Sequence, residues 1–112
     1  MQSMENKFTS STLHSGSMRC YSNFTPSGTT FATDVPTALG GRGEFPTPAA
    51  MLAATVASCM LSMIAYTAAR RQVQAEGICI KAACTEGENG ICGIELQITV
   101  PSALTHTDRK AI

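Results

Sequence analysis

The segment that most constrains the fold is the uncharged stretch from Pro48 to the Arg70-Arg71 pair, PAAMLAATVASCMLSMIAYTAARR, with Cys59 near its middle. Ala, Leu and Met are strong helix formers, and proline is favoured in the first turn of a helix. No glycine and no further proline interrupts the stretch. It therefore predicts one long helix over residues 48–71.

This predicted helix is apolar on all sides. One stripe along it carries Leu52, Cys59 and Met63, and the opposite side consists largely of alanine. Such a helix is either a membrane span or the centre of a soluble core, and its length alone fits a span. Because alanine and hydroxyl side chains dilute its hydrophobicity, we expect a buried helix in a soluble protein and no membrane partner.

Composition excludes several classes of function. Eight basic and eight acidic residues balance, Trp is absent, and no basic cluster extends beyond Arg70-Arg71, so we expect no nucleic-acid partner. The polar N-terminus lacks the apolar segment of a signal peptide, which favours a cytoplasmic location.

The cysteines point to a reducing compartment. Their number is odd, they form no CxxC pair, and no histidine lies near any of them, which argues against a disulfide scaffold or a zinc site. We expect no metal and no cofactor. The five are Cys20, Cys59, Cys79, Cys84 and Cys92.

The chain before the long helix is predicted to form antiparallel strands. Residues 1–17 are rich in Ser and Thr and form either a frayed end or a first strand. Residues 18–23 and 29–34 alternate around a turn sequence at 25–28 and predict a hairpin. Residues 35–48 carry three glycines and three prolines, so we expect an irregular loop of the kind that lines sites.

The chain after the helix predicts a second hairpin. Residues 78–83 and 94–100 alternate apolar and polar side chains, which is typical of half-buried antiparallel strands, and Asn-Gly at 89–90 supplies a turn. Residues 102–112 have the pattern of the start of another helix.

The element order of strands, long helix, strands and short helix predicts an α+β fold, with residues 1–112 as one domain. A few short strands cannot cover both sides of an apolar helix. The simplest solution is a homodimer, in which sheets from two chains enclose a pair of helices.

Several motifs, in this order, resemble a known family. They are Thr-Asp-Val-Pro at 33–36, Leu-Gly-Gly-Arg-Gly at 39–43, and the helical segment 47–59 that ends in Cys59. An Asp-x-Pro strand end, a Gly-Gly-x-Gly loop and a cysteine-bearing helix resemble the OsmC/Ohr family of peroxide-detoxifying proteins, especially its OsmC-like branch. Similar pieces at 75–77 and 98–101 extend the resemblance over residues 18–112.

The resemblance implies an intertwined homodimer, with antiparallel strands packed around long central helices and two sites at the subunit interface. It also implies a thiol-dependent peroxidase, in which the helix cysteine attacks the O–O bond of an organic hydroperoxide and becomes a sulfenic acid. A second cysteine on a later helix then forms a disulfide with it, and an external dithiol reduces that disulfide.

Cys59 matches the reactive cysteine of the family. Desolvation raises the pKa of a mid-helix thiol among apolar side chains, so a cation must approach it to favour the thiolate. Arg19, on a predicted early strand, and Arg42, in the glycine-rich loop, are the candidate cations. The residues expected to line a substrate pocket are Leu52, Thr55 and Met63.

Two features depart from the family pattern. The family's glutamate at the start of the helix falls on Ala49 or Ala50, and Glu44 is the candidate replacement, whereas Asp34 is expected to cap a strand end. The second cysteine would lie beyond Ile112, which leaves the strand cysteines as alternative resolving thiols: Cys79, Cys84 and Cys92. The alternative functions are a non-catalytic dimeric binding or redox-responsive module and a structural dimer without a ligand.

Overall fold

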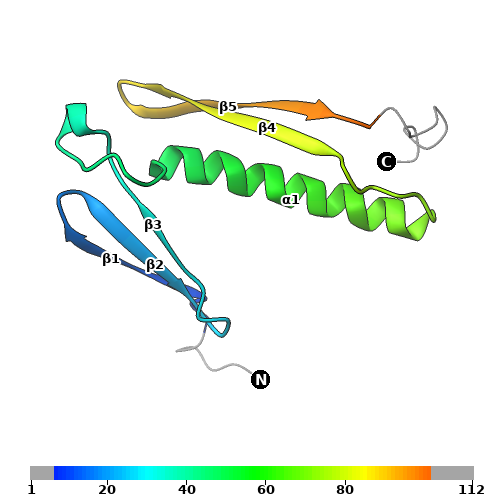
Figure 1. Ribbon diagram of the computed structural model, residues 1–112, viewed down its shortest axis with the longest axis horizontal. Helices are drawn as coiled ribbons and strands as arrows, with labels where there is room; N and C mark the ends of the chain where they lie inside the picture. The colour runs from blue at the N-terminus through cyan, green and yellow to red at the C-terminus, as the bar shows by residue number, and fades with distance from the viewer. Residues whose placement is uncertain (1–6, 102–112) are drawn as a thin grey trace. The chain divides into compact units, whose positions relative to one another are not determined.

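The computed structural model describes residues 7–101, which form an α+β fold with one long helix and two small antiparallel sheets (Figure 1). This confirms the predicted fold class. The chain divides into two compact units, Met1–Pro48 and Ala49–Ile112, and each is described by itself. The helix predicted to begin after Pro101 lies outside the described residues.

The first unit contains a three-stranded antiparallel sheet with the strand order β1-β2-β3. Its strands are β1 (Ser10–Gly16), β2 (Arg19–Phe24) and β3 (Thr30–Thr33). The predicted hairpin is therefore present, and the segment before it contains a strand. The turn between β2 and β3 contains Gly28 at φ 76°, a conformation that glycine adopts without steric cost.

The predicted glycine-rich loop follows β3 and folds back on itself. The N–H of Asp34 donates to the carbonyl of Pro46 (3.0 Å), and the N–H of Gly43 donates to the carbonyl of Val35 (3.1 Å). A short 3₁₀ helix, η2 (Thr37–Leu39), lies in the part of the loop that both hydrogen bonds enclose. The loop is therefore a closed structure, and its two ends meet at Asp34.

A buried ion pair occupies the closed end of this loop. Arg19 from β2 donates from Nε to Oδ1 of Asp34 (2.8 Å) and from Nη2 to Oδ2 (2.7 Å). Oδ2 also accepts the backbone N–H groups of Glu44 (2.9 Å) and Phe45 (3.1 Å). Asp34 is fully buried. Asp34 directly follows β3, at the expected strand end, and its carboxylate also joins β2 to the returning loop.

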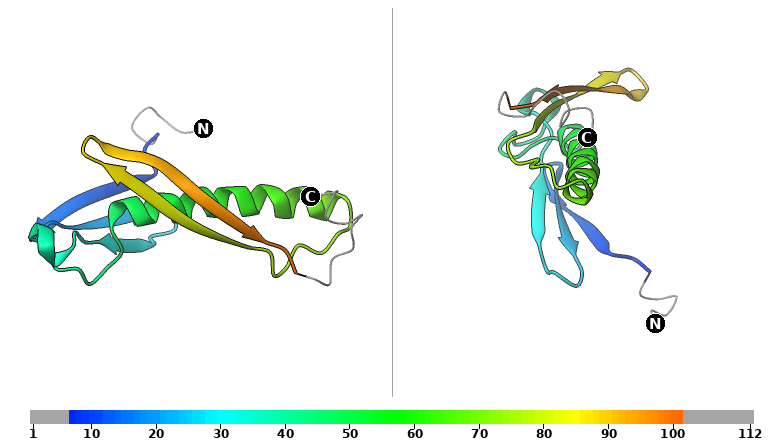
Figure 2. Two further views of the ribbon diagram at one scale, coloured as in Figure 1. Left: turned by 90° about the horizontal axis from the view of Figure 1, so that it is seen from above. Right: turned by 90° about the vertical axis from the view of Figure 1, so that its right-hand side faces the viewer.

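The second unit consists of the long helix α1 (Pro48–Arg70) and a hairpin of β4 (Cys79–Gly87) and β5 (Gly90–Thr99). The helix ends within one residue of the prediction, and both strands reach closer to the turn than expected. The hairpin lies beside one side of α1 (Figure 2).

The hairpin shows the predicted alternation. Ile80, Ala82 and Cys84 are half-buried, whereas Lys81 and Ala83 between them are exposed. The apolar side of the hairpin therefore faces the helix, and the more polar side faces away.

The helix is much less covered than expected. The buried residues within it are all small, and large apolar side chains stay exposed, for example Met63 at 61% and Tyr66 at 60%. The prediction of a buried helix is therefore wrong for the single chain, because a two-stranded sheet covers only one side of it. By length and composition alone, α1 would also be able to cross a membrane.

Replacing Gly41 with alanine should destabilise the protein, because the added methyl group would overlap the backbone carbonyl of Val35. Forcing extra volume into a packed site costs about 1–3 kcal/mol in the free energy of unfolding. Gly93→Ala is the matched control, since an added methyl group meets no atom within 4 Å there. Denaturant titration of both variants checks this prediction, and equal stabilities would contradict it.

Asp34 should make stability depend on acid pH. The hydrogen bonds from Arg19 hold the pKa of Asp34 well below its usual range, and the N–H groups of Glu44 and Phe45 add to this, against the opposing effect of burial. Because folding lowers this pKa, the stabilisation is complete above the unfolded value of about 4 and is lost as the pH falls below it.

Denaturant titrations from pH 6 down to about pH 2 test this, because the free energy of unfolding of the wild type should fall more steeply than that of Asp34→Asn. The variant should also be less stable near pH 6, since it leaves Arg19 buried with a neutral partner. Parallel pH profiles for the two proteins would contradict the prediction.

Candidate active site

Cys59 lies in the middle of α1, and its side chain is exposed in the described chain. Helical geometry places it on one stripe with Leu52, Thr55 and Met63, which are exposed as well. The hydroxyl of Thr55, one turn before Cys59, donates to the carbonyl of Met51 (2.8 Å). The thiol is therefore accessible on an apolar helix face and is not packed inside this chain.

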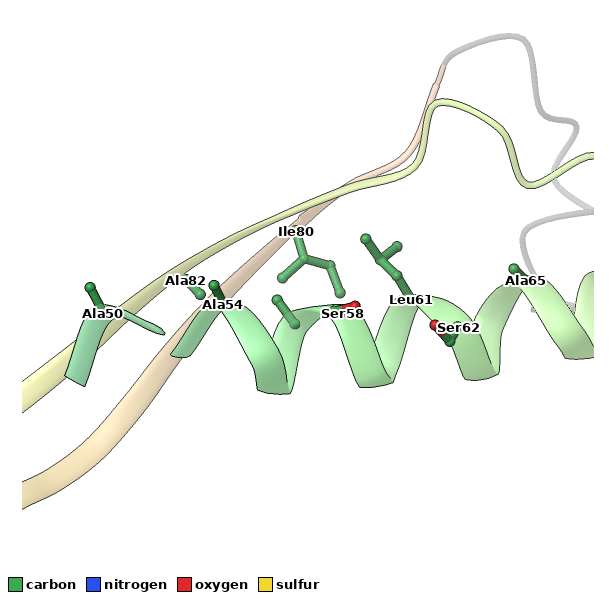
Figure 3. Close-up of a pocket in the computed structure, with 9 residues that line it drawn as sticks. Ala50, Ala54, Ser58, Leu61, Ser62, Ala65, Ile80 and Ala82 are labelled. Carbon is green, nitrogen blue, oxygen red and sulfur yellow. The ribbon is translucent and has the colours of Figure 1, made fainter. Parts of the chain in front are cut away.

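A groove lies on the opposite side of α1, between the helix and β4 (Figure 3). Its volume is about 550 Å³, and its walls combine small helix residues with two hairpin side chains. The lining residues are Ala50, Ala54, Ala57, Ser58, Leu61, Ser62, Ala65, Ile80 and Ala82. Cys59 and the three predicted pocket residues are not among them. Their role in a substrate pocket remains a prediction.

The described cysteines of the hairpin do not face Cys59. Cys84 is half-buried on the side of β4 that also presents Ile80 and Ala82, and these two line the groove on the far side of α1 from Cys59. Cys79 is exposed on the other side of the hairpin. The side chain of Cys92 lies outside the described part of the structure. Within the helix-hairpin unit, neither described hairpin thiol is placed to react directly with Cys59.

Arg19 is held by two carboxylates. Besides its two bonds to Asp34, its Nη2 donates to Oε1 of Glu44 (2.6 Å), and the ring of Phe45 lies 4.6 Å from its Cζ. The hydrogen bonds that Arg19 donates to Asp34 and then to Glu44 raise its pKa, so it stays charged. Glu44 therefore pairs with Arg19, and its replacement of the family's helix glutamate remains a prediction. Arg42, in the same loop, is exposed.

Sequence reasoning missed Asp34 as the main partner of Arg19. The signal lies in the strand register, because Cys20 pairs with Thr33 and extending this register by one residue sets Arg19 opposite Asp34. Phe45 was missed as well. Its contact depends on how the loop returns, which the local sequence pattern does not specify.

Among residues 7–101, no group of three or more His, Cys, Asp or Glu side chains is arranged to hold a metal ion. The chemical groups that stand out are instead a thiol on a helix and a buried guanidinium in a loop.

No protein-family model matches the sequence, and no curated protein matches it. Solved structures do match. A protein from Psychrobacter arcticus 273-4, described as an osmotic stress induced and detoxification response protein, shares 25% identity over 98% of this chain and 80% of its own, with a TM-score of 0.83.

Two further structures match at lower identity and support the fold. The organic hydroperoxide resistance protein OsmC from Legionella pneumophila has a TM-score of 0.66 and 22% identity over 91% of this chain and 75% of its own. An organic hydroperoxide resistance protein from Vibrio cholerae has captopril bound in one active site. Its TM-score is 0.56, with 21% identity over 87% of this chain and 67% of its own.

These structures share the arrangement of two antiparallel sheets and one long helix with this chain. The motifs that suggested the family lie at the end of β3, in the closed loop and along α1. The chain therefore shares its fold with OsmC and organic hydroperoxide resistance proteins, which is consistent with the family resemblance of its motifs.

Proposed function

We propose that this protein is a thiol-dependent peroxidase that reduces organic hydroperoxides. The observation that carries the proposal is the accessible thiol of Cys59 on an apolar helix face, in a fold shared with organic hydroperoxide resistance proteins. The thiolate of Cys59 attacks the O–O bond, the bond breaks, and a proton is taken up. The products are an alcohol and a sulfenic acid on Cys59.

An external dithiol completes the cycle. One of its sulfurs displaces hydroxide, released as water, from the sulfenic acid and forms a mixed disulfide with Cys59. Its second sulfur then breaks that bond, which restores the Cys59 thiol and leaves the reductant oxidised. We propose an external reductant for the described chain because Cys79 and Cys84 do not face Cys59 in the helix-hairpin unit.

We propose Arg19, with Arg42 as the second candidate, as the cation that favours the Cys59 thiolate. Arg19 is 7% exposed and is fixed by a bidentate carboxylate, so its guanidinium is oriented before any substrate binds. Arg42 is exposed, which would leave its charge screened by water.

The substrate is proposed to be a hydroperoxide with an apolar chain or ring. Leu52, Thr55 and Met63 share the helix stripe with Cys59, so they are the side chains that such a group would contact. Methionine and leucine provide an adaptable apolar surface, and the Thr55 hydroxyl is already engaged by the carbonyl of Met51.

We further propose a soluble cytoplasmic homodimer. The stripe that carries Cys59 includes side chains 45% exposed at Leu52 and 61% exposed at Met63. An apolar face of this kind is unstable in water and is typical of an interface. A second copy of the chain would cover it and place Cys59 at the subunit interface.

Cys59→Ser should abolish hydroperoxide consumption. With cumene hydroperoxide and a dithiol reductant, the turnover rate should fall on the order of 100-fold or more, because the nucleophile is lost. Cys79→Ser is the matched control, since Cys79 is the other described cysteine that is exposed, and it should retain activity. Equally slow turnover in the wild type and Cys59→Ser would favour the non-catalytic module instead.

Met63→Glu should convert the dimer to a monomer, because the new carboxylate would be buried in an apolar interface. Light scattering after gel filtration should give the mass of two chains for the wild type and of one chain for the variant. Gln97→Glu adds the same charge at an exposed position of β5 and should remain dimeric. A monomeric wild type would contradict the proposed assembly.

A further inference from the structure

The cluster around Arg19 carries more negative than positive charge. Arg19 contributes one positive charge, and Asp34 and Glu44 contribute one negative charge each. A nearby negative charge raises the pKa of a thiol, so the intact cluster would disfavour a thiolate beside it. One of the two carboxylates must move away from Arg19 before the guanidinium can stabilise another anion.

The two carboxylates are not equivalent. Asp34 is fully buried and accepts four hydrogen bonds, two from Arg19 and two from backbone N–H groups. The Glu44 side chain is 64% exposed, and its described side-chain contact is the single bond from Nη2 of Arg19. Breaking a buried pair is costly, whereas an exposed carboxylate loses little when it turns into water.

The point of competition is a single nitrogen. Nη2 of Arg19 donates to both carboxylates, to Oδ2 of Asp34 at 2.7 Å and to Oε1 of Glu44 at 2.6 Å. This nitrogen carries two N–H groups, so withdrawal of Glu44 frees one of them while the bidentate pair with Asp34 remains. The ring of Phe45 still stacks on the guanidinium and keeps its plane fixed.

We infer that Glu44 is a releasable competitor that occupies the anion-binding edge of Arg19, and that Asp34 is the positioning residue that holds Arg19 in both states. The inference rests on the proposed role of Arg19 as the cation that serves Cys59. It assigns opposite effects to the two carboxylates, whereas a purely structural role would give both the same sign.

The rate of Cys59 alkylation by iodoacetamide, followed on the Cys59 peptide by mass spectrometry between pH 5 and 9, tests the inference on the full chain. Glu44→Gln removes the competing charge and should raise the rate at pH 6 about threefold or more, with the profile shifted to lower pH. Asp34→Asn should lower the rate by a similar factor, because Arg19 loses its orientation.

Glu95→Gln is the matched control, since it removes a carboxylate from an exposed position of β5, and it should leave the rate unchanged. Arg19→Met distinguishes a failure of the proposed role of Arg19 from a failure of the inference about Glu44. If it leaves the profile unchanged, the proposed role of Arg19 is wrong and the inference fails with it.

If Arg19→Met slows alkylation and Glu44→Gln slows it or leaves it unchanged, only the inference is overturned. Glu44 would then support Arg19 and would not compete for it. Should Asp34→Asn fail to fold, Glu44→Gln and Arg19→Met still decide, because the sign of the Glu44→Gln effect is the distinguishing result.

Discussion

The buried ion pair of Arg19 and Asp34 joins two parts of the first unit, β2 and the loop that follows β3. The same carboxylate accepts two backbone N–H groups at the other end of that loop. Without it, the buried guanidinium would keep only the exposed carboxylate of Glu44 as counter-charge, and the loop would lose the group that closes it. The proposed chemistry depends on this pair too, because it orients the cation before any reactant arrives.

The second constraint is the shape of α1. A helix that is apolar on all sides must be covered on all sides, and one hairpin covers only the side that carries the groove. The exposed stripe with Cys59 is therefore both the reason for proposing a dimer and the place where substrate would bind. The side chains of this stripe would therefore serve both the dimer interface and the binding of substrate.

Local sequence patterns were sufficient for the elements themselves. The lack of Gly and Pro after Pro48 predicted α1 to within one residue, and alternation predicted both hairpins. An irregular loop at 35–48 was predicted from its glycines and prolines. These features depend on neighbours in sequence, which is why they were accessible without a structure.

The candidate site was accessible only in part. Cys59, Arg19 and Glu44 were named as candidates from the sequence, but the contacts of Asp34 were not predicted, because they depend on the β2–β3 register and on the return of the loop to Asp34. The expected burial of α1 was also wrong for one chain, since burial depends on what lies outside it. The contacts of Asp34 and the burial of α1 both depend on groups that are not neighbours in the sequence.

The most direct test of the central claim is the distance from Sγ of Cys59 to Cζ of Arg19 in a crystal structure of the assembled protein. If Arg19 serves the thiolate, some pairing of the two groups, within one chain or across the interface, should bring them within about 6 Å. A separation beyond about 10 Å in every pairing, at which exposed charges are largely screened, would contradict the account.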